Sequence, residues 1–107
     1  AQAEGYGCSY EIREGVPGAV LTNDPEETMK AFGIAREAFG EDEVVYPGPT
    51  FLGSEDFAFM LQERPGTYCF IGNGDTPMVH HPEFTFDPGN LTRGAAYWVA
   101  LAEGYLR

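Results

Sequence analysis

Basic residues are scarce in this chain. Lys and Arg number 6 against 17 Asp and Glu in 107 residues, which gives a formal net charge of −11 at pH 7. Without a cluster of Lys or Arg, the chain lacks the positive surface that nucleic acids require, and its negative field repels anionic membranes. We therefore expect no nucleic-acid partner and no membrane partner. Solubility alone accounts for most such acidic excesses.

Long apolar runs are also missing. No stretch of the sequence approaches the ~20 apolar residues that span a bilayer. The first residues do not show the basic-then-apolar pattern of a secretory signal. A cytoplasmic location is therefore expected, although a piece of a longer protein would not carry its native start.

Cysteine is rare as well. Cys8 and Cys69 lie far apart in two apolar, strand-like runs, and no CxxC or CxxH spacing supports a zinc site. The pattern favours two buried thiols over a disulfide or over a metal-binding or catalytic role.

The composition is that of a globular protein, because 43% of the residues are apolar and 14% are aromatic. Alternation over residues 6–13 predicts a half-buried strand. The apolar run 44–46 predicts a brief strand, and residues 67–71, apolar on both faces, predict a central strand. Open α/β sheets bind ligands where such strands end. The Gly-rich break at 15–18 is the best boundary between two structural units.

Three helices are predicted between and after these strands. Asp24 can cap the first, with Pro25 at its first position, Glu27 closing a capping box and Gly40 ending it. Ser54 can cap the second, which ends before residues 65–66. Either Asp87 or Asn90 can cap the last. Its predicted core stripe is Leu91, Ala95, Trp98, Ala102 and Tyr105. The order of elements indicates an α/β fold with helices on a small sheet.

The chemistry-bearing feature is the pair His80 and His81, which are the only histidines in the chain. Imidazole is a good ligand for zinc and similar ions, but a catalytic zinc needs about three protein ligands. Neighbouring residues on an extended segment point opposite ways, so we expect one imidazole of the pair at a site. An exposed or merely hydrogen-bonded histidine is the alternative. No Gly-x-Ser-x-Gly elbow and no phosphate-binding loop occurs, which leaves metal-assisted chemistry.

Several motifs together resemble the C-terminal third of a hippurate hydrolase, in the amidohydrolase branch of the zinc carboxypeptidase and aminoacylase families. The resemblance covers roughly residues 10 to 107, and its strength lies in the order and spacing of the motifs. These are Asn23-Asp24-Pro25-Glu26, Gly53-Ser54-Glu55-Asp56-Phe57-Ala58-Phe59, Pro65-Gly66, Phe70-Ile71-Gly72-Asn73-Gly74, Val79-His80-His81-Pro82-Glu83-Phe84 and Gly94-Ala95-Ala96.

The resemblance implies a two-lobed enzyme with an α/β catalytic domain and an inserted lid. Residues 1–14 would be the last strand of the lid, or dimerisation, domain. Residues 15–107 would be the C-terminal part of a mixed-sheet metallohydrolase catalytic domain. The full-length protein would then be a homodimer, since the lid usually carries the dimer contact in that family.

The resemblance also assigns roles to residues of this chain. His80 matches the histidine that opens the family's His-x-Pro motif and would be a metal ligand, whereas His81 would only support it. Gly53, Glu55 and Asp56 would border the substrate cleft, although the helix dipole alone explains two acidic residues in a first turn. Thr85 departs from the family, where relatives often carry an acidic residue.

The family's His-x-Cys-Gly-His-Asp ligand motif and its Glu-Glu pair, which holds the general base, do not occur in these 107 residues. The resemblance therefore implies part of an enzyme that hydrolyses N-acyl amino acids with a two-ion site of Zn, Mn, Co or Ni. The chain alone is expected to bind metal weakly and to be inactive. The alternatives are a metallopeptidase for short peptides and a non-catalytic binding or assembly module with half of this fold.

Overall fold

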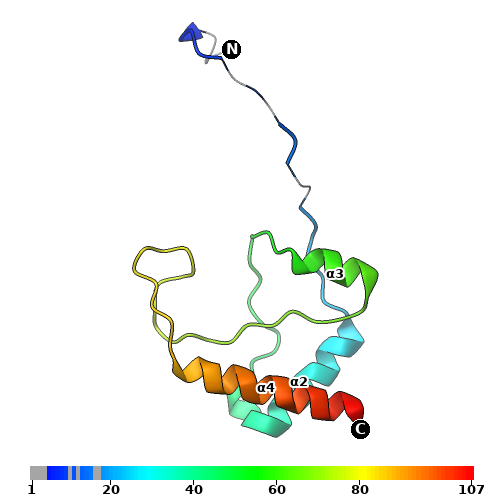
Figure 1. Ribbon diagram of the computed structural model, residues 1–107. Coiled ribbons are helices and arrows are strands. Elements are labelled where there is room, and N and C mark those ends of the chain that lie inside the picture. Colours follow the sequence, from blue (N-terminus) through cyan, green and yellow to red (C-terminus); the bar gives the residue numbers. More distant parts are fainter. Residues whose placement is uncertain (1–4, 10, 12, 16–17) are drawn as a thin grey trace.

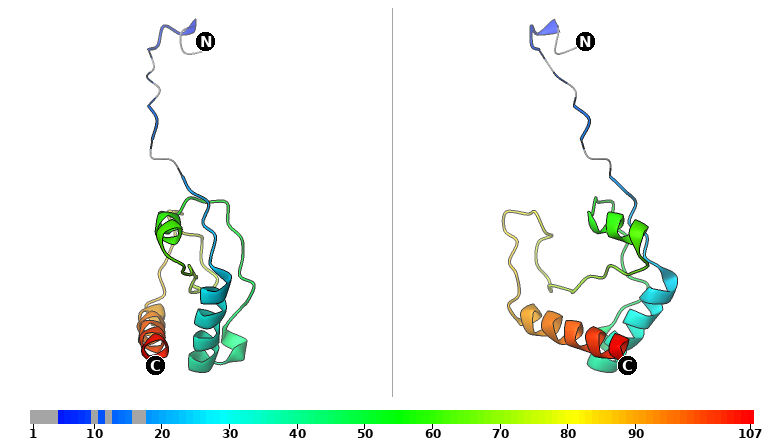
Figure 2. Two further views of the ribbon diagram at one scale, coloured as in Figure 1. Left: turned by 90° about the vertical axis from the view of Figure 1, so that its right-hand side faces the viewer. Right: turned by 45° about the vertical axis from the view of Figure 1, so that its right-hand side comes forward.

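The computed structural model describes residues 5–9, 11, 13–15 and 18–107. Its elements are α2 (Pro25–Phe39), the short 3-10 helix η1 (Glu41–Glu43), α3 (Phe57–Glu63) and α4 (Gly89–Leu106) (Figure 1). The described residues before Gly18 lead away from these helices, as all three views show (Figures 1 and 2). In the described part of the chain, no helix has both the length and the apolar character needed to cross a membrane.

Helix α2 begins and ends where the sequence predicts. Asp24 accepts a hydrogen bond from the backbone N–H of Glu27 at 2.9 Å, Pro25 occupies the first turn, and Gly40 follows the last residue with a φ of 94°. The predicted capping box is wrong in its second half. The backbone N–H of Asp24 donates to the carbonyl of Gly66 at 2.9 Å, and the Glu27 carboxylate accepts instead from the Tyr105 hydroxyl. The N-terminus of α2 is thereby tied to two distant segments.

Helix α4 packs against α2. The Tyr97 ring lies 6.2 Å from that of Phe39, and Gly104 lies against Ile34. On α2, Ala31 and Ala35 are the buried residues. The Tyr97 hydroxyl donates to the carbonyl of Ala31 at 3.2 Å. Burial, and then the neighbouring Cys69, raise the pKa of Tyr97 to about 12, so this phenol stays protonated and keeps its donor at neutral pH.

The close approach of the two helices depends on Gly104. A Cβ added at Gly104 would lie 2.7 Å from Cδ1 and 3.1 Å from Cγ1 of Ile34. At Gly33 of α2, by contrast, an added Cβ would meet no described atom within 4 Å. The two glycines therefore form a matched pair, one at the contact and one on the open side.

We expect Gly104→Ala to destabilise the α2–α4 contact by about 1 kcal/mol, because overpacking at Ile34 outweighs the gain in helix propensity. Gly33→Ala is expected to stabilise the same contact by roughly 0.5–1 kcal/mol, since only propensity changes there. Helix content followed by circular dichroism during denaturation measures both. Equal stabilisation by the two substitutions would show that Gly104 is not a contact residue.

The predicted core stripe of α4 is wrong. Its residues are exposed, and Trp98 is 73% exposed while Leu91 is 66% exposed. Helix α4 is apolar on two faces, and the face that carries Gly104 is the one that admits α2 closely. Leu91, Ala95, Trp98 and Ala102 of the stripe are left exposed, whereas Tyr105 reaches α2, where its hydroxyl donates to Glu27 and its ring lies 3.5 Å from Nζ of Lys30.

The predicted strands are not found, because the described residues include no strand. Of the strand predicted at 6–13, Tyr10 and Ile12 lie outside the described residues, as do Val16 and Pro17 of the predicted break. A strand needs a neighbouring backbone for its N–H and C=O groups, and no backbone hydrogen bond joins residues 67–71 to another part of the chain that the structure describes. The Asn23 amide donates to the carbonyl of Tyr68 and accepts from its N–H, both at 2.8 Å. The Asn23 side chain thus satisfies the backbone N–H and C=O of one residue, whereas a paired strand would satisfy those of several residues.

Helix α3 begins at Phe57, so Ser54 lies outside it and the predicted start is wrong by two residues. Its buried residue is Ala58, whereas Met60 is 64% exposed. The cysteines are free, as predicted, but the predicted burial is wrong because both are exposed.

The protein's surface is large for its mass. It amounts to 9279 Å², whereas a compact protein of 11.7 kDa exposes about 5,900 Å². Among the described residues the buried apolar ones are small, namely Ala31, Ala35 and Ala58. The core that the composition predicts is therefore incomplete within this chain.

Candidate functional site

His80 lies at the tip of the loop formed by residues 74–86, here called the His80 loop, which leads into α4. Its φ is 71°, in the left-handed region. The carbonyl of Met78 accepts from the N–H of His81 at 3.1 Å, which makes His80 the third residue of a turn. A left-handed φ at this position is typical of type II turns. For a residue with a side chain it costs roughly 1–2 kcal/mol, and such strain gathers at functional sites.

His81 has a different place in the same loop. Its Nδ1 atom accepts from the backbone N–H of Glu83 at 3.1 Å, and its carbonyl accepts from the N–H of Phe84 at 3.0 Å. The Nδ1 lone pair is thus used inside the turn, and the proton of the neutral ring lies on Nε2. Both imidazoles are exposed, but only His80 has the strained, left-handed backbone conformation. The supporting role of His81 stays a prediction.

Two asparagines close the base of the His80 loop, and the sequence alone did not single them out. Asn73 precedes the loop and contacts Thr85 near the end of the loop and Asp87 just beyond it. Asn90, in the first turn of α4, donates to the carbonyl of Gly72 at 3.0 Å and to Oδ1 of Asn73 at 3.3 Å. An asparagine on each side of a histidine-bearing loop was the available signal.

The other predicted site residues lie elsewhere. Glu55 accepts from the Tyr68 hydroxyl at 3.1 Å and from the N–H of Phe57 at 3.3 Å. The first of these bonds raises the pKa of Tyr68. Gly53 and Asp56 are exposed. These contacts give Glu55 a structural role at the start of α3, in addition to any part in a cleft.

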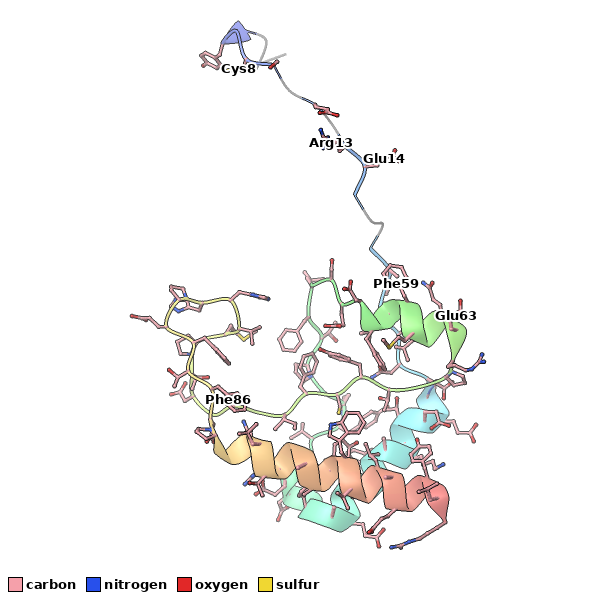
Figure 3. All side chains as sticks on the ribbon, viewed as in Figure 1. Cys8, Arg13, Glu14, Phe59, Glu63 and Phe86 are labelled. Carbon is pink, nitrogen blue, oxygen red and sulfur yellow. The ribbon has the colours of Figure 1, made fainter. Side chains whose placement is uncertain are left out.

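The His80 loop and α3 are not brought together. Figure 3 shows Phe86, at the end of the loop, beside the start of α4 and away from Phe59 and Glu63 of α3. A shallow hollow of about 420 Å³ lies between the start of α2 and residues 61–66, and no predicted site residue lines it. Within this chain, the loop and the predicted cleft residues therefore form no common pocket that the structure describes.

The described residues hold no group of three or more His, Cys, Asp or Glu side chains that could bind a metal ion. His80 offers one exposed imidazole, which is a suitable donor for zinc and similar ions but is not a site. The residues present therefore do not fit a complete metal centre. Any such centre needs ligands from outside the described part of the chain.

Comparison with known proteins decides the family. The sequence profile of peptidase family M20/M25/M40 matches residues 6–104. The chain belongs to this family. Its peptidases are generally dependent on divalent metals.

Three curated relatives illustrate the M20-family likeness. The hippurate hydrolase of Campylobacter jejuni is 29% identical over 98% of this chain and 27% of its own length. The putative amidohydrolase YhaA of Bacillus subtilis is 35% identical over 94% of this chain and 26% of its own length. The N-acetyl-L-cysteine deacetylase of Bacillus subtilis is 39% identical over 80% of this chain and 20% of its own length. No solved structure gave a significant match.

The relatives confirm the resemblance to M20-type amidohydrolases. The chain spans about a quarter of the length of the first two relatives described. The M20-family assignment fits the predicted class of a metallohydrolase catalytic domain, while the described residues contain helices and no strand. The incomplete core and the incomplete metal centre agree with this partial coverage.

Proposed function

We propose that this chain is part of a metal-dependent amidohydrolase that cleaves the amide bond of N-acyl amino acids. The observation that carries the proposal is His80, an exposed imidazole on a strained turn, in a chain whose relatives are named hydrolases and deacetylases of this kind. His80 would supply one metal ligand. The substrate would be a small hippurate-like molecule.

The residues that the chain contains indicate which parts of the active site it would supply. A bound divalent ion of such an enzyme polarises the amide carbonyl and lowers the pKa of water. This chain would hold the ion through His80, orient the turn through His81, and give Gly53, Glu55 and Asp56 to one cleft wall. The described residues offer no group of three or more His, Cys, Asp or Glu side chains that could form the whole site. The general base and the other ligands are therefore assigned to the remainder of the polypeptide.

The same remainder is the proposed partner of the open face of α4. That face carries Leu91 and Trp98, and the surface of the chain exceeds that of a compact protein by more than half. A surplus of this size matches the larger, more apolar interfaces between permanent partners. Residues 1–14 would continue into a lid domain, and the complete protein would be a cytoplasmic homodimer.

The test is made on the full-length protein. We expect it to release the free amino acid from N-benzoylglycine or N-acetyl amino acids, to lose activity with a chelator, and to regain it with Zn, Mn, Co or Ni. Loss and recovery of activity would be followed by amino-acid analysis. A metal-replete protein that is folded but releases no amino acid from any N-acyl substrate would contradict the proposal.

A metallopeptidase acting on short peptides is the second candidate, because the matching family is described as one of peptidases. The two functions differ in the group on the acyl side of the cleaved bond. A panel of dipeptides beside the matching N-acyl amino acids separates them through kcat/KM. Preference for dipeptides would favour the peptidase.

A further inference from the structure

The His80 loop is closed by a network centred on one side chain. The amide of Asn73 contacts both ends of the loop through both of its polar atoms. Its Nδ2 donates to the hydroxyl of Thr76 at 2.8 Å and to the carbonyl of Thr85 at 2.7 Å. Its Oδ1 accepts from the backbone N–H of Asp87 at 2.8 Å. A single carboxamide therefore fixes where the loop leaves the body and where it returns.

Asn90 braces this carboxamide from α4. It donates to Oδ1 of Asn73 at 3.3 Å and to the carbonyl of Gly72 at 3.0 Å. Asn73, Thr76 and Asn90 are half-buried, whereas His80 and His81 at the tip are exposed. The base of the loop is thus ordered by hydrogen bonds, and the tip is free to present a side chain.

We propose that Asn73, supported by Asn90, is a positioning residue that sets the geometry of His80 as a metal ligand. This inference rests on the proposed function. His80 lies in a turn with a φ of 71°, a conformation that must be over-determined by its surroundings to persist. The tip contributes only two local turns, so the anchor between the loop and α4 comes from the asparagine pair. Partners of this kind, which orient a ligand without touching the metal, tune metal affinity.

The chemistry of the amide gives a sharp variant. Asn73→Asp keeps the shape and the acceptor atom but replaces the Nδ2 donor with an oxygen, which faces the carbonyl of Thr85. Two acceptors then oppose each other and the loop must open. Because the variant also adds a negative charge, the double variant Asn73→Asp/Asp75→Asn restores the net charge without restoring the donor. Asp75 is exposed in the same loop, and the single variant Asp75→Asn completes the set.

The measurement is the dissociation constant of the full-length protein for Zn²⁺, by competition with a chromophoric chelator. We expect Asn73→Asp and the double variant to weaken binding by roughly 10- to 100-fold, and Asp75→Asn to change it less than twofold. The kcat at saturating metal should fall with KM little changed. Asn90→Ala removes the bonds to Gly72 and Asn73 but leaves the bonds of Asn73 to Thr76, Thr85 and Asp87 in place. It should act in the same direction with a smaller effect, and it serves as the test if Asn73→Asp does not fold.

His80→Ala in the same assay separates the two proposals. If His80→Ala weakens Zn²⁺ binding while the Asn73 and Asn90 variants leave it within twofold, the positioning role is wrong and the proposed function stands. If His80→Ala also leaves the affinity unchanged, both are wrong. A fall in the melting temperature of the metal-free protein without any change in affinity would show that Asn73 only stabilises the fold, and would also overturn the inference.

Discussion

Replacing His80 by alanine in the full-length protein is expected to lower kcat/KM for N-acyl amino acids by about 10³-fold or more. A bound metal contributes several kcal/mol of transition-state stabilisation, and each 1.4 kcal/mol corresponds to a factor of ten in rate. Losing one ligand of a small set removes or displaces the ion. Steady-state kinetics with added metal, together with metal content by elemental analysis, would measure both consequences.

His81 provides the matched control, because it is the same residue type one position away. His81→Ala removes an acceptor for the N–H of Glu83 and leaves the His80 imidazole in place. We expect this substitution to lower kcat/KM by roughly tenfold, the scale of a residue that supports a ligand. If the two variants lose activity equally, or if His81→Ala loses more, the assignment of His80 as the ligand is wrong.

The second large effect concerns Trp98, the only tryptophan of the chain. In this chain it is 73% exposed on the open face of α4. If the remainder of the protein covers that face, Trp98→Ala should destabilise the full-length protein by about 3–5 kcal/mol, as large-to-small core substitutions do. In the isolated chain the same substitution should leave the helix content nearly unchanged.

Chemical denaturation of the full-length protein and circular dichroism of the isolated chain make this comparison. The isolated chain should also bind a hydrophobic dye such as ANS strongly, as expected of exposed apolar surface, and should hydrolyse nothing. A cost below about 0.5 kcal/mol in the full-length protein, typical of surface positions, would show that the open face is not an internal interface.

The parts of the fold that depend on neighbouring residues could be predicted from the sequence. Asp24, Pro25 and Gly40 mark the limits of α2 because caps and breakers act within one turn. Whether residues 67–71 form a strand could not be decided from the sequence pattern, since a strand forms only where a second strand pairs with its backbone groups. The apolar periodicity of α4 identified the helix but not the face that packs. Only the approach at Gly104 decides that.

The candidate site, like the fold, could be predicted only where it depends on neighbouring residues. The motif around His80 is local and directed attention to the loop of residues 74–86, and the strained φ of His80 adds a physical reason that no pattern shows. The roles of Asn23 and Asn73 depend on partners 45 and 12 residues away in sequence. Such hydrogen bonds are set by how distant segments meet. Sequence spacing alone therefore did not reveal them.

The most direct test of the central claim is the intact mass of the natural protein that contains this sequence, captured from its source cells and sequenced upstream of Ala1. Relatives of which this chain spans about a quarter lead us to expect a mass several-fold larger than 11.7 kDa. The upstream part should carry a His-x-Cys-Gly-His-Asp motif and a later Glu-Glu pair. A natural protein that ends near Ala1, or one that is longer but has neither motif, would contradict the claim that His80 completes the metal site of an amidohydrolase.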